Sequence, residues 1–403
     1  MNDRKGFGSN FGFLMAAVGS AVGLGNIWGF PNKMGANGGF PFLILYLALA
    51  LCCGVIIMLG ELALGRKTGH GAVGAYQSIS KRFKWLGWLG IAAAALIFSF
   101  YSALGGYCLR YVVVNFGNLI GAEFGTNGVG GADVFQGLLS QPDVSIAFAL
   151  AFMLITMLVV MSGVGGGIER VCSVGMPALF FILIICIIRS CTLPGAADGL
   201  KYMFVPGWAV ANGIIDEAPG FWRVLTAAGG QMFFSLSLAM GAMITYGSYL
   251  NQKEDLVKNS AIIVFADTLV ATMAGIAVIP AAVANGIASG TPLDQIKLGG
   301  PNLLFVTLQD VFRAMGTVGA LFGVIFYLLV LIAAISSAIA LIEVDITYFL
   351  DRAEQKGRKG NRPKVAFLVC LAIFAVSVLV GIDGLGTTGV FPWPATAGWN
   401  DSM

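Results

Sequence analysis

Long apolar segments recur along the whole chain, and shorter stretches between them collect the charged residues. A helix needs about 20 apolar residues to cross the hydrocarbon core of a bilayer, and nine segments reach or approach that length. Their approximate ranges are 10–32, 40–65, 86–116, 146–162, 171–193, 225–250, 260–284, 316–349 and 364–382. No segment has the period-two alternation of a strand, and lipid excludes open sheet edges. The pattern predicts an all-α polytopic membrane protein.

The composition agrees with this interpretation. Of the 403 residues, 58% are hydrophobic and 11% are charged, whereas about a quarter of the residues of a soluble domain are charged. The seven cysteines lie in or beside apolar segments without the spacing of metal ligands, so we interpret them as packing residues. We expect a lipid bilayer around the protein and no nucleic-acid partner.

The distribution of basic residues predicts an orientation. With the N-terminus in the cytoplasm, 16 of the 23 Lys and Arg residues fall on the cytoplasmic side, as the positive-inside rule requires. The protein is then a multi-pass protein of the cell membrane. The stretch 285–315 lies outside and contains the apolar run Leu303–Val306, which we expect to pack back onto the protein.

Polar side chains inside the apolar segments are few, and each is a candidate for function. Two carboxylates stand out, Glu61 in the second segment and Asp267 in the seventh. The uncharged polar candidates are Ser20, Asn26, Tyr101, Ser235, Ser237, Ser336 and Ser337.

The first and sixth segments both have a weak centre. The first carries Gly19, Gly23, Gly25 and Gly29 around Asn26, and the sixth has two serines and a glycine at mid-span. One explanation is that these glycines merely allow neighbouring helices to pack closely, and that the serine hydroxyls bond carbonyls of their own helix. A break would instead free carbonyls for a cation and N–H groups for a carboxylate. Weak centres in corresponding segments favour the break, because inverted-repeat transporters bind substrate there.

At these residues the sequence resembles the neurotransmitter:sodium symporter family, and its bacterial Na⁺-coupled amino-acid transporters in particular. The stretch 19–28 (Gly-Ser-Ala-Val-Gly-Leu-Gly-Asn-Ile-Trp) resembles the first-helix signature of the family, and 233–238 (Phe-Phe-Ser-Leu-Ser-Leu) resembles the sixth. The stretch 333–337 (Ala-Ala-Ile-Ser-Ser) resembles the sodium motif of the eighth helix. The resemblance runs in matching order from about residue 4 to residue 382.

The resemblance implies an inverted-repeat fold of five plus five helices with broken helices 1 and 6. Residues 1–193 then form the first repeat (helices 1–5), and 194–224 form an extracellular loop. Residues 225–382 form helices 6–9 of the second repeat, and 383–403 form an extracellular tail or the start of a tenth helix. Family members have eleven or twelve helices, so we expect the second repeat to be incomplete here.

The resemblance also implies two sodium sites. The first takes the Ala21 carbonyl, the Asn26 amide oxygen, Ser235 and a group near Asp267, completed by the substrate carboxylate. The second takes the carbonyls of Gly19, Val22 and Ala333 and the hydroxyls of Ser336 and Ser337. Sets of five or six oxygens with at most one charge suit a monovalent ion, whereas Ca²⁺ favours more carboxylates.

The implied substrate site lies between the two breaks. Its residues are Ser20, Ala21, Gly23, Leu24, Gly25, Ile97, Tyr101, Phe234, Ser237, Met240, Ser337 and Leu341. The carboxylate of the substrate would meet the N–H groups of Leu24 and Gly25 and the Tyr101 hydroxyl. None of these side chains is charged, so we expect a neutral amino acid that is hydrophobic or aromatic.

Four further residues match the inner gate of the family. Arg4 and Asp351 fit its cytoplasmic ion pair, and Phe7 and Tyr249 lie beside them in the family pattern. Glu61 resembles the carboxylate that binds free N–H groups at the breaks. Where the family usually has a basic outer-gate residue, this chain has Gly29. Animal members use chloride to balance sodium, and a carboxylate near Asp267 would replace it, so we expect chloride-independent transport.

Two other classes of function are compatible with this scaffold. A substrate-gated channel would give currents, and a non-transporting amino-acid sensor would bind without accumulating its ligand. An intramembrane enzyme is disfavoured, because the sequence has no Ser/His dyad, HExxH or paired Asp motif. The leading hypothesis is sodium-coupled symport of a neutral amino acid into the cell by alternating access.

Overall fold

The computed structural model describes residues 6–126, 128–296, 298 and 303–384. In the first half, the helices are α1 (Asn10–Ala21), α2 (Phe30–Ala36), α3 (Phe40–Leu49), α4 (Val55–Thr68), α5 (Ala72–Ile79), α6 (Lys84–Ile120), α7 (Gly131–Leu139), α8 (Pro142–Met161) and α9 (Arg170–Cys191). In the second half they are α10 (Ala196–Phe204), α11 (Trp208–Ala211), α12 (Phe221–Ser235), α13 (Ala242–Ser248), α14 (Leu256–Ala288), α15 (Leu308–Ala314), α16 (Gly316–Gln355) and α17 (Arg362–Ile382).

Short π-helical turns join or extend several of these helices. They are η1 (Gly25–Gly29), η2 (Ala50–Gly54), η4 (Val164–Glu169) and η6 (Leu303–Thr307), and η3 (Lys81–Phe83) and η5 (Leu293–Gln295) are 3₁₀ turns. With η2, α3 and α4 form one span over Phe40–Thr68. A π-helical turn within a long helix often marks a functional site.

The all-α membrane architecture predicted from the sequence is confirmed. Among the described residues, seven helices are long and apolar enough to cross a membrane. An eighth span consists of Asn10–Ala21 and Gly25–Ala36, which are bent by 46° at the break between them. The remaining predicted segment, 225–250, contains the end of α12 and the whole of α13, with six residues between the two helices.

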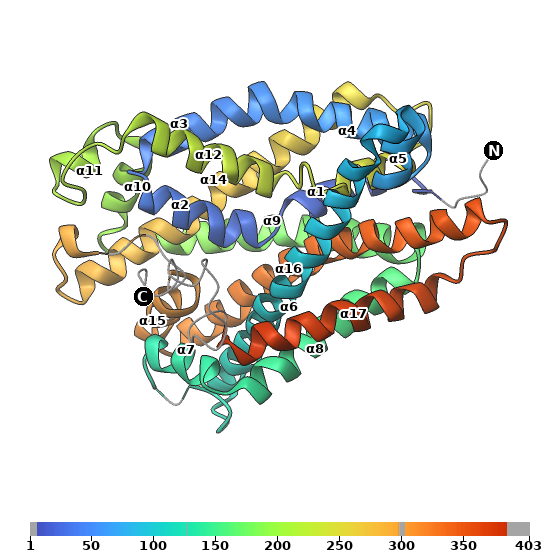
Figure 1. The fold of residues 1–403 in the computed structure, drawn as a ribbon. Helices are drawn as coiled ribbons and strands as arrows, with labels where there is room; N and C mark the ends of the chain where they lie inside the picture. Colours follow the sequence, from blue (N-terminus) through green and yellow to red (C-terminus); the bar gives the residue numbers. More distant parts are fainter. Residues whose placement is uncertain (1–5, 127, 297, 299–302, 385–403) are drawn as a thin grey trace.

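Two long helices form the centre of the bundle. α6 crosses it diagonally and packs against α16 (Figure 1). Glycines let a further helix approach α6 closely, because a Cβ on Gly105 would lie 2.5 Å from the Phe152 ring of α8. A Cβ on Gly106 would lie 2.6 Å from the backbone nitrogen of Ala149. Small residues at helix contacts are the usual way to gain van der Waals packing in lipid.

Short helices cover both ends of the bundle. α7, α10, α11 and α15 lie at one end, and α5 lies at the other (Figure 1). The helices α7, α10 and α11 lie within 117–145 and 194–224, two stretches between the predicted spans for which the sequence analysis predicts no helix. They are at most nine residues long, too short for a spanning pattern to detect.

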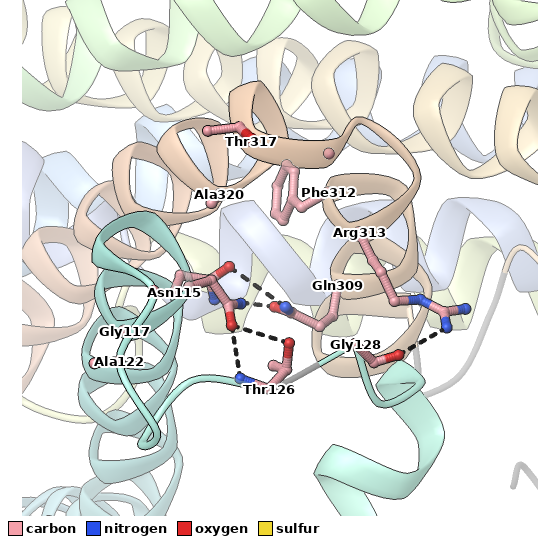
Figure 2. A pocket seen from close by; sticks show the side chains of 13 residues that line it. Asn115, Gly117, Ala122, Thr126, Gly128, Gln309, Phe312, Arg313, Thr317 and Ala320 are labelled. Atoms are coloured by element: carbon pink, nitrogen blue, oxygen red, sulfur yellow. Dashed lines mark hydrogen bonds between the residues drawn. The ribbon is translucent and has the colours of Figure 1, made fainter.

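The apolar run at Leu303 packs back onto the protein, as predicted. Leu303 and Phe305 are each 1% exposed. The Phe305 ring stacks on Phe135 of α7 with centroids 5.4 Å apart, and its carbonyl accepts a hydrogen bond from the Tyr111 hydroxyl. Figure 2 shows the neighbouring contact, where the side-chain amides of Asn115 and Gln309 bond each other. The segment around Phe305 is thereby fixed to α6 and α7.

Candidate functional site

The first span is interrupted where the sequence predicts a break. α1 ends at Ala21, Val22 turns to an extended conformation (ψ 106°), and the chain resumes as a helix at Gly25. In a continuous helix the carbonyls of these residues would accept hydrogen bonds from the next turn, and the break leaves them free. Gly23 fits this turn because a Cβ there would lie 2.2 Å from the Ser337 hydroxyl oxygen.

The sixth predicted segment is interrupted next to the first break. Between α12 and α13, Ser237 and Ala239 have φ angles of 53° and 64°, and Gly241 has 79°. Positive φ is costly for residues with a Cβ, and such strain concentrates at functional sites. The Ala239 N–H donates to Glu61 Oε1 of α4 at 2.7 Å, so a buried carboxylate satisfies the freed backbone, as the family resemblance implies for Glu61.

The two breaks face each other across a narrow cavity. The Ser237 hydroxyl donates to the Ser20 carbonyl at 2.8 Å, and the Leu24 N–H donates to the Tyr101 hydroxyl at 3.1 Å. The cavity is lined by Ser20, Ala21, Gly23, Gly25, Ile97, Tyr101, Phe234, Ser237, Met240, Ser337 and Leu341. These are all the residues assigned to substrate in the sequence except Leu24.

The shape and chemistry of this cavity constrain any ligand. Its volume is about 20 Å³, close to the space of one water, so an amino acid requires the lining side chains to move apart. The lining contains no charged side chain. Ile97, Phe234, Met240 and Leu341 supply apolar surface, while the backbone of the first break and Tyr101 supply polar groups.

Asp267 of α14 lies at the centre of a buried polar cluster behind this cavity. Its carboxylate accepts hydrogen bonds from Asn26 Nδ2 (2.7 Å), from the Ser235 hydroxyl (2.9 Å) and from the Tyr46 hydroxyl (3.2 Å). Asp267 and Asn26 are 0% exposed. The structure thus brings together three of the groups assigned to the first sodium site.

Some contacts of the groups assigned to the first sodium site differ from the expectation. The Asn26 amide oxygen accepts the Gly23 N–H at 3.0 Å, so one of its two lone pairs is already used. Ala21 lines the cavity beside this cluster. Tyr46 also belongs to the cluster around Asp267, although the sequence analysis did not assign it there. The only feature that could have pointed to it is a hydroxyl group in the apolar second span. The cluster has one formal negative charge, which suits a monovalent cation.

The oxygens assigned to the second sodium site also lie together. The Ser337 hydroxyl is 3.3 Å from the Gly19 carbonyl and 3.3 Å from the Val22 carbonyl. The Ser336 hydroxyl is 3.0 Å from the Ala333 carbonyl and 3.5 Å from that of Val22. Five neutral oxygens from the first break and α16 therefore share one small volume. This donor set fits Na⁺, which transporters coordinate with carbonyls at unwound helices.

Gln231 occupies the space beside Gly29, the residue at the outer-gate position. Its Nε2 donates to the Gly25 carbonyl at 2.6 Å. A Cβ on Gly29 would lie 3.3 Å from the Gln231 amide oxygen. A neutral amide from α12 thus lies beside the position at which the family resemblance implies a basic side chain. Only its location in the sixth segment could have identified Gln231 from the sequence.

An ion pair that sequence reasoning missed joins α16 to the start of α17. Arg362 of α17 pairs with Glu343 of α16, which also accepts a hydrogen bond from the Tyr249 hydroxyl at 2.7 Å. Phe7 packs edge-on against Tyr249 with ring centroids 6.3 Å apart. The sequence did contain an indication of this pair, because Glu343 lies within the predicted span 316–349, where a charge is costly unless it is paired.

The predicted pair of Arg4 and Asp351 lies partly outside the described residues, since these begin at residue 6. Asp351 is 4% exposed, and its Oδ2 accepts the Gly71 N–H at 2.8 Å. The same oxygen lies 3.7 Å from His70 Nδ1. His70 therefore faces a buried carboxylate, whereas the sequence alone gives it no role.

Comparisons with known proteins agree with this geometry. The family model for the sodium:neurotransmitter symporter family matches residues 4–127 and 132–391. An uncharacterized sodium-dependent transporter of Bacillus subtilis, YhdH, is 36% identical over 92% of this chain and 77% of its own length. Another uncharacterized sodium-dependent transporter, MJ1319 of Methanocaldococcus jannaschii, is 31% identical over 95% of this chain and 76% of its own length.

A solved structure is similar over nearly the whole chain. The crystal structure of MhsT in complex with L-phenylalanine has a TM-score of 0.81 and 34% sequence identity, and the match covers 96% of this chain and 83% of that one. The interrupted spans, the family model and these relatives lead to one conclusion. The chain belongs to the sodium:neurotransmitter symporter family.

Proposed function

We propose that the chain carries a neutral amino acid with a hydrophobic or aromatic side chain into the cell together with Na⁺. The observation that carries the proposal is the composition of the cavity between the breaks. Its apolar wall has no charge to balance an acidic or basic side chain, and burying an unpaired charge costs several kcal/mol or more. The similar structure of MhsT contains L-phenylalanine, which has this chemistry.

The backbone at the first break would bind the carboxylate of the amino acid. The Leu24 N–H now donates to the Tyr101 hydroxyl, and a carboxylate between them would accept from both groups. The Ser20 carbonyl, which now accepts from Ser237, is one of the acceptors within reach of the ammonium group. A carboxylate beside Asn26 and Ser235 would complete the first sodium site, so the binding of the ion and of the substrate would be coupled.

Alternating access follows from the position of these groups between movable half-helices. With the N-terminus in the cytoplasm, α1 and α13 would lie on the inner side of the breaks, and η1, α2 and α12 would lie on the outer side. Opening on one side requires the half-helices there to separate while the others stay packed. We place the N-terminal side in the cytoplasm because of the distribution of Lys and Arg. The two oxygen clusters support two Na⁺ sites.

Uptake by the purified protein in proteoliposomes tests the proposal. With an inward Na⁺ gradient, we expect leucine, phenylalanine or tryptophan to accumulate above the external concentration, and we expect replacement of Na⁺ by K⁺ to abolish accumulation. Uptake of glutamate or lysine exceeding that of leucine and tryptophan would refute the assigned substrate class. Currents without accumulation would indicate a channel, and saturable binding without uptake would indicate a sensor.

Tyr101→Phe separates the substrate site from the scaffold. The variant removes the hydroxyl that faces the first break, and we expect substrate affinity to fall about tenfold, as for loss of a hydrogen bond to a charged group. Tyr76→Phe on α5 is the matched control, because Tyr76 does not line the cavity. Equal affinities for both variants would contradict the placement of the carboxylate.

A further inference from the structure

A separate cavity of about 280 Å³ lies at the inner end of the bundle. It is enclosed by α5, the start of α6 and the end of α16, whereas the substrate cavity is enclosed by the two breaks, α6 and α16. Its lining includes Gln77, Lys84, Trp88, Tyr348, Arg352 and Gln355. None of these residues belongs to the sodium or substrate sites.

The charge in this cavity is unbalanced. Lys84 comes from α6 and Arg352 from α16, and within the described part of the chain neither forms an ion pair. Among the described residues, Arg352 donates only to the Tyr348 hydroxyl, at 3.1 Å. The carboxylate in the wall, Asp351, is 4% exposed and already accepts the Gly71 N–H. The cavity therefore presents two cations to an incoming group.

The surroundings of the cavity are those of a membrane interface. Trp88 packs against Tyr348 with ring centroids 4.7 Å apart and is 43% exposed. Trp85 and Leu89 on α6 are each 56% exposed; they lie one helical turn apart, next in sequence to the cavity residues Lys84 and Trp88. Tryptophan is enriched at the headgroup level of membranes. Lys81 and Arg82 directly precede this stretch.

We propose that this cavity binds the headgroup of an anionic phospholipid. The phosphate lies between Lys84 and Arg352, and the side-chain amides of Gln77 and Gln355 contact the polar part of the headgroup. The acyl chains follow the exposed apolar face of α6 at Trp85 and Leu89. Charge complementarity selects the anionic lipid, because clustered Lys and Arg side chains next to a spanning helix attract such headgroups.

Binding there would affect the inner end of the protein. The headgroup would contact α5, α6 and α16 at once, and α16 carries Asp351 next to Arg352. A lipid that holds these three helices together favours the conformations in which they are packed. This inference depends on the membrane architecture and not on the identity of the transported substrate.

Fluorescence quenching tests the site on the intact chain. The protein is reconstituted in phosphatidylcholine vesicles containing increasing fractions of phosphatidylglycerol with brominated acyl chains, which quench nearby tryptophan. The Trp88 signal is the difference between the protein and its Trp88→Phe variant. We expect saturable quenching at a low fraction of phosphatidylglycerol, and weaker quenching when brominated phosphatidylcholine replaces it.

Charge-removing variants locate the binding groups. Lys84→Gln and Arg352→Gln should each raise the lipid fraction at half-saturation about fivefold, because one cation near an anionic surface contributes about 1 kcal/mol. Lys356→Gln and Lys359→Gln are matched controls on the same side of the membrane, since they do not line the cavity. Lys84→Arg and Arg352→Lys, which keep the charge, should bind like the original protein.

Three outcomes would overturn the proposal. Equal quenching by both brominated lipids would mean that the headgroup is not recognised. Equal shifts for the control lysines would mean a diffuse surface attraction without a site. Displacement of brominated phosphatidylglycerol by millimolar inorganic phosphate, but not by equal ionic strength of chloride, would assign the cavity to a soluble phosphate ion.

Discussion

The Asn26 side-chain amide donates to the Asp267 carboxylate, with 2.7 Å between Nδ2 and Oδ1. This bond joins the broken first span to the middle of α14, two segments 241 residues apart in sequence. Ser235, the last residue of α12, donates to the same carboxylate. Both interrupted segments therefore meet at one buried negative charge, and we propose that a cation binds beside it.

The first prediction concerns chloride. Asp267 supplies a fixed negative charge beside the proposed first sodium site, so we expect transport at the same rate in chloride and in gluconate. Asp267→Asn removes that charge, and we expect uptake to fall at least tenfold in gluconate and to recover partly as chloride is raised. Sodium-driven uptake at constant ionic strength measures both effects.

Asp294→Asn serves as the control for this experiment. Asp294 lies in the exposed turn η5, so its loss removes one negative charge without changing the buried cluster. A transport rate of the unaltered protein that tracked external chloride would show that Asp267 does not replace the anion.

The second prediction concerns the oxygens near Ser336. Its hydroxyl lies 3.0 Å from the Ala333 carbonyl and 3.5 Å from the Val22 carbonyl. Ser336→Ala removes one of five assigned sodium ligands, so we expect the half-saturating Na⁺ concentration to rise about 5–10-fold. Ser78→Ala is the control, because that hydroxyl bonds only within α5. An unchanged Na⁺ dependence would remove Ser336 from the site.

The third prediction concerns the space at Gly23. A Cβ there would lie 2.2 Å from the Ser337 hydroxyl oxygen and 2.8 Å from the Tyr101 hydroxyl oxygen. Gly23→Ala should therefore abolish uptake, because the new methyl group must displace residues of both the substrate and the second sodium site. Gly60→Ala in α4 adds a methyl group where no atom lies within 4 Å, and it should transport normally. Normal uptake by Gly23→Ala would contradict the geometry of the break.

Much of this arrangement could be predicted from the sequence. Apolar length indicates each span, because the thickness of the bilayer fixes the number of residues needed. Glycines and small polar residues such as Asn26 and Ser237 indicate the breaks, because local backbone conformation depends on nearby residues. The family motifs then assign groups such as Ser336, and the fold places these groups side by side.

Other contacts could not be predicted, because they depend on tertiary packing. Tyr46 and Gln231 belong to no motif of the sequence analysis. The packing of α3 against α12 brings Tyr46 to Ser235, and the packing of α12 against η1 brings Gln231 to Gly25. Arg362 lies 19 residues from Glu343, and the turn between α16 and α17 decides whether they meet. The short helix α7 is amphipathic over only nine residues, and its contact with η6 depends on the stacking of Phe135 on Phe305.

A fourth prediction concerns Glu169, which lies at the end of η4. Its carboxylate accepts the Gly8 N–H at 2.7 Å and the Ser9 hydroxyl at 2.9 Å, and Ser9 caps the N-terminus of α1. A negative charge stabilises that helix end. Glu169→Gln should increase the labelling rate of a cysteine introduced at Phe11, which is 56% exposed on α1, because the N-terminal end of α1 separates more often. Glu217→Gln, in an exposed outer segment, should leave that rate unchanged, and equal rates in both variants would contradict this role.

The last prediction concerns the pair of Glu343 and Arg362. Glu343 is 0% exposed, so removing one partner leaves a buried charge without its counterion, at a cost of roughly 3–5 kcal/mol. Glu343→Gln should therefore lower the thermal unfolding midpoint strongly, whereas Asp198→Asn, in an exposed pair with Lys201, should change it little. The double variant Glu343→Leu/Arg362→Leu removes both charges and should recover part of the loss. If the double variant were as unstable as Glu343→Gln, the loss would come from packing or from the Tyr249 hydrogen bond rather than from an uncompensated charge.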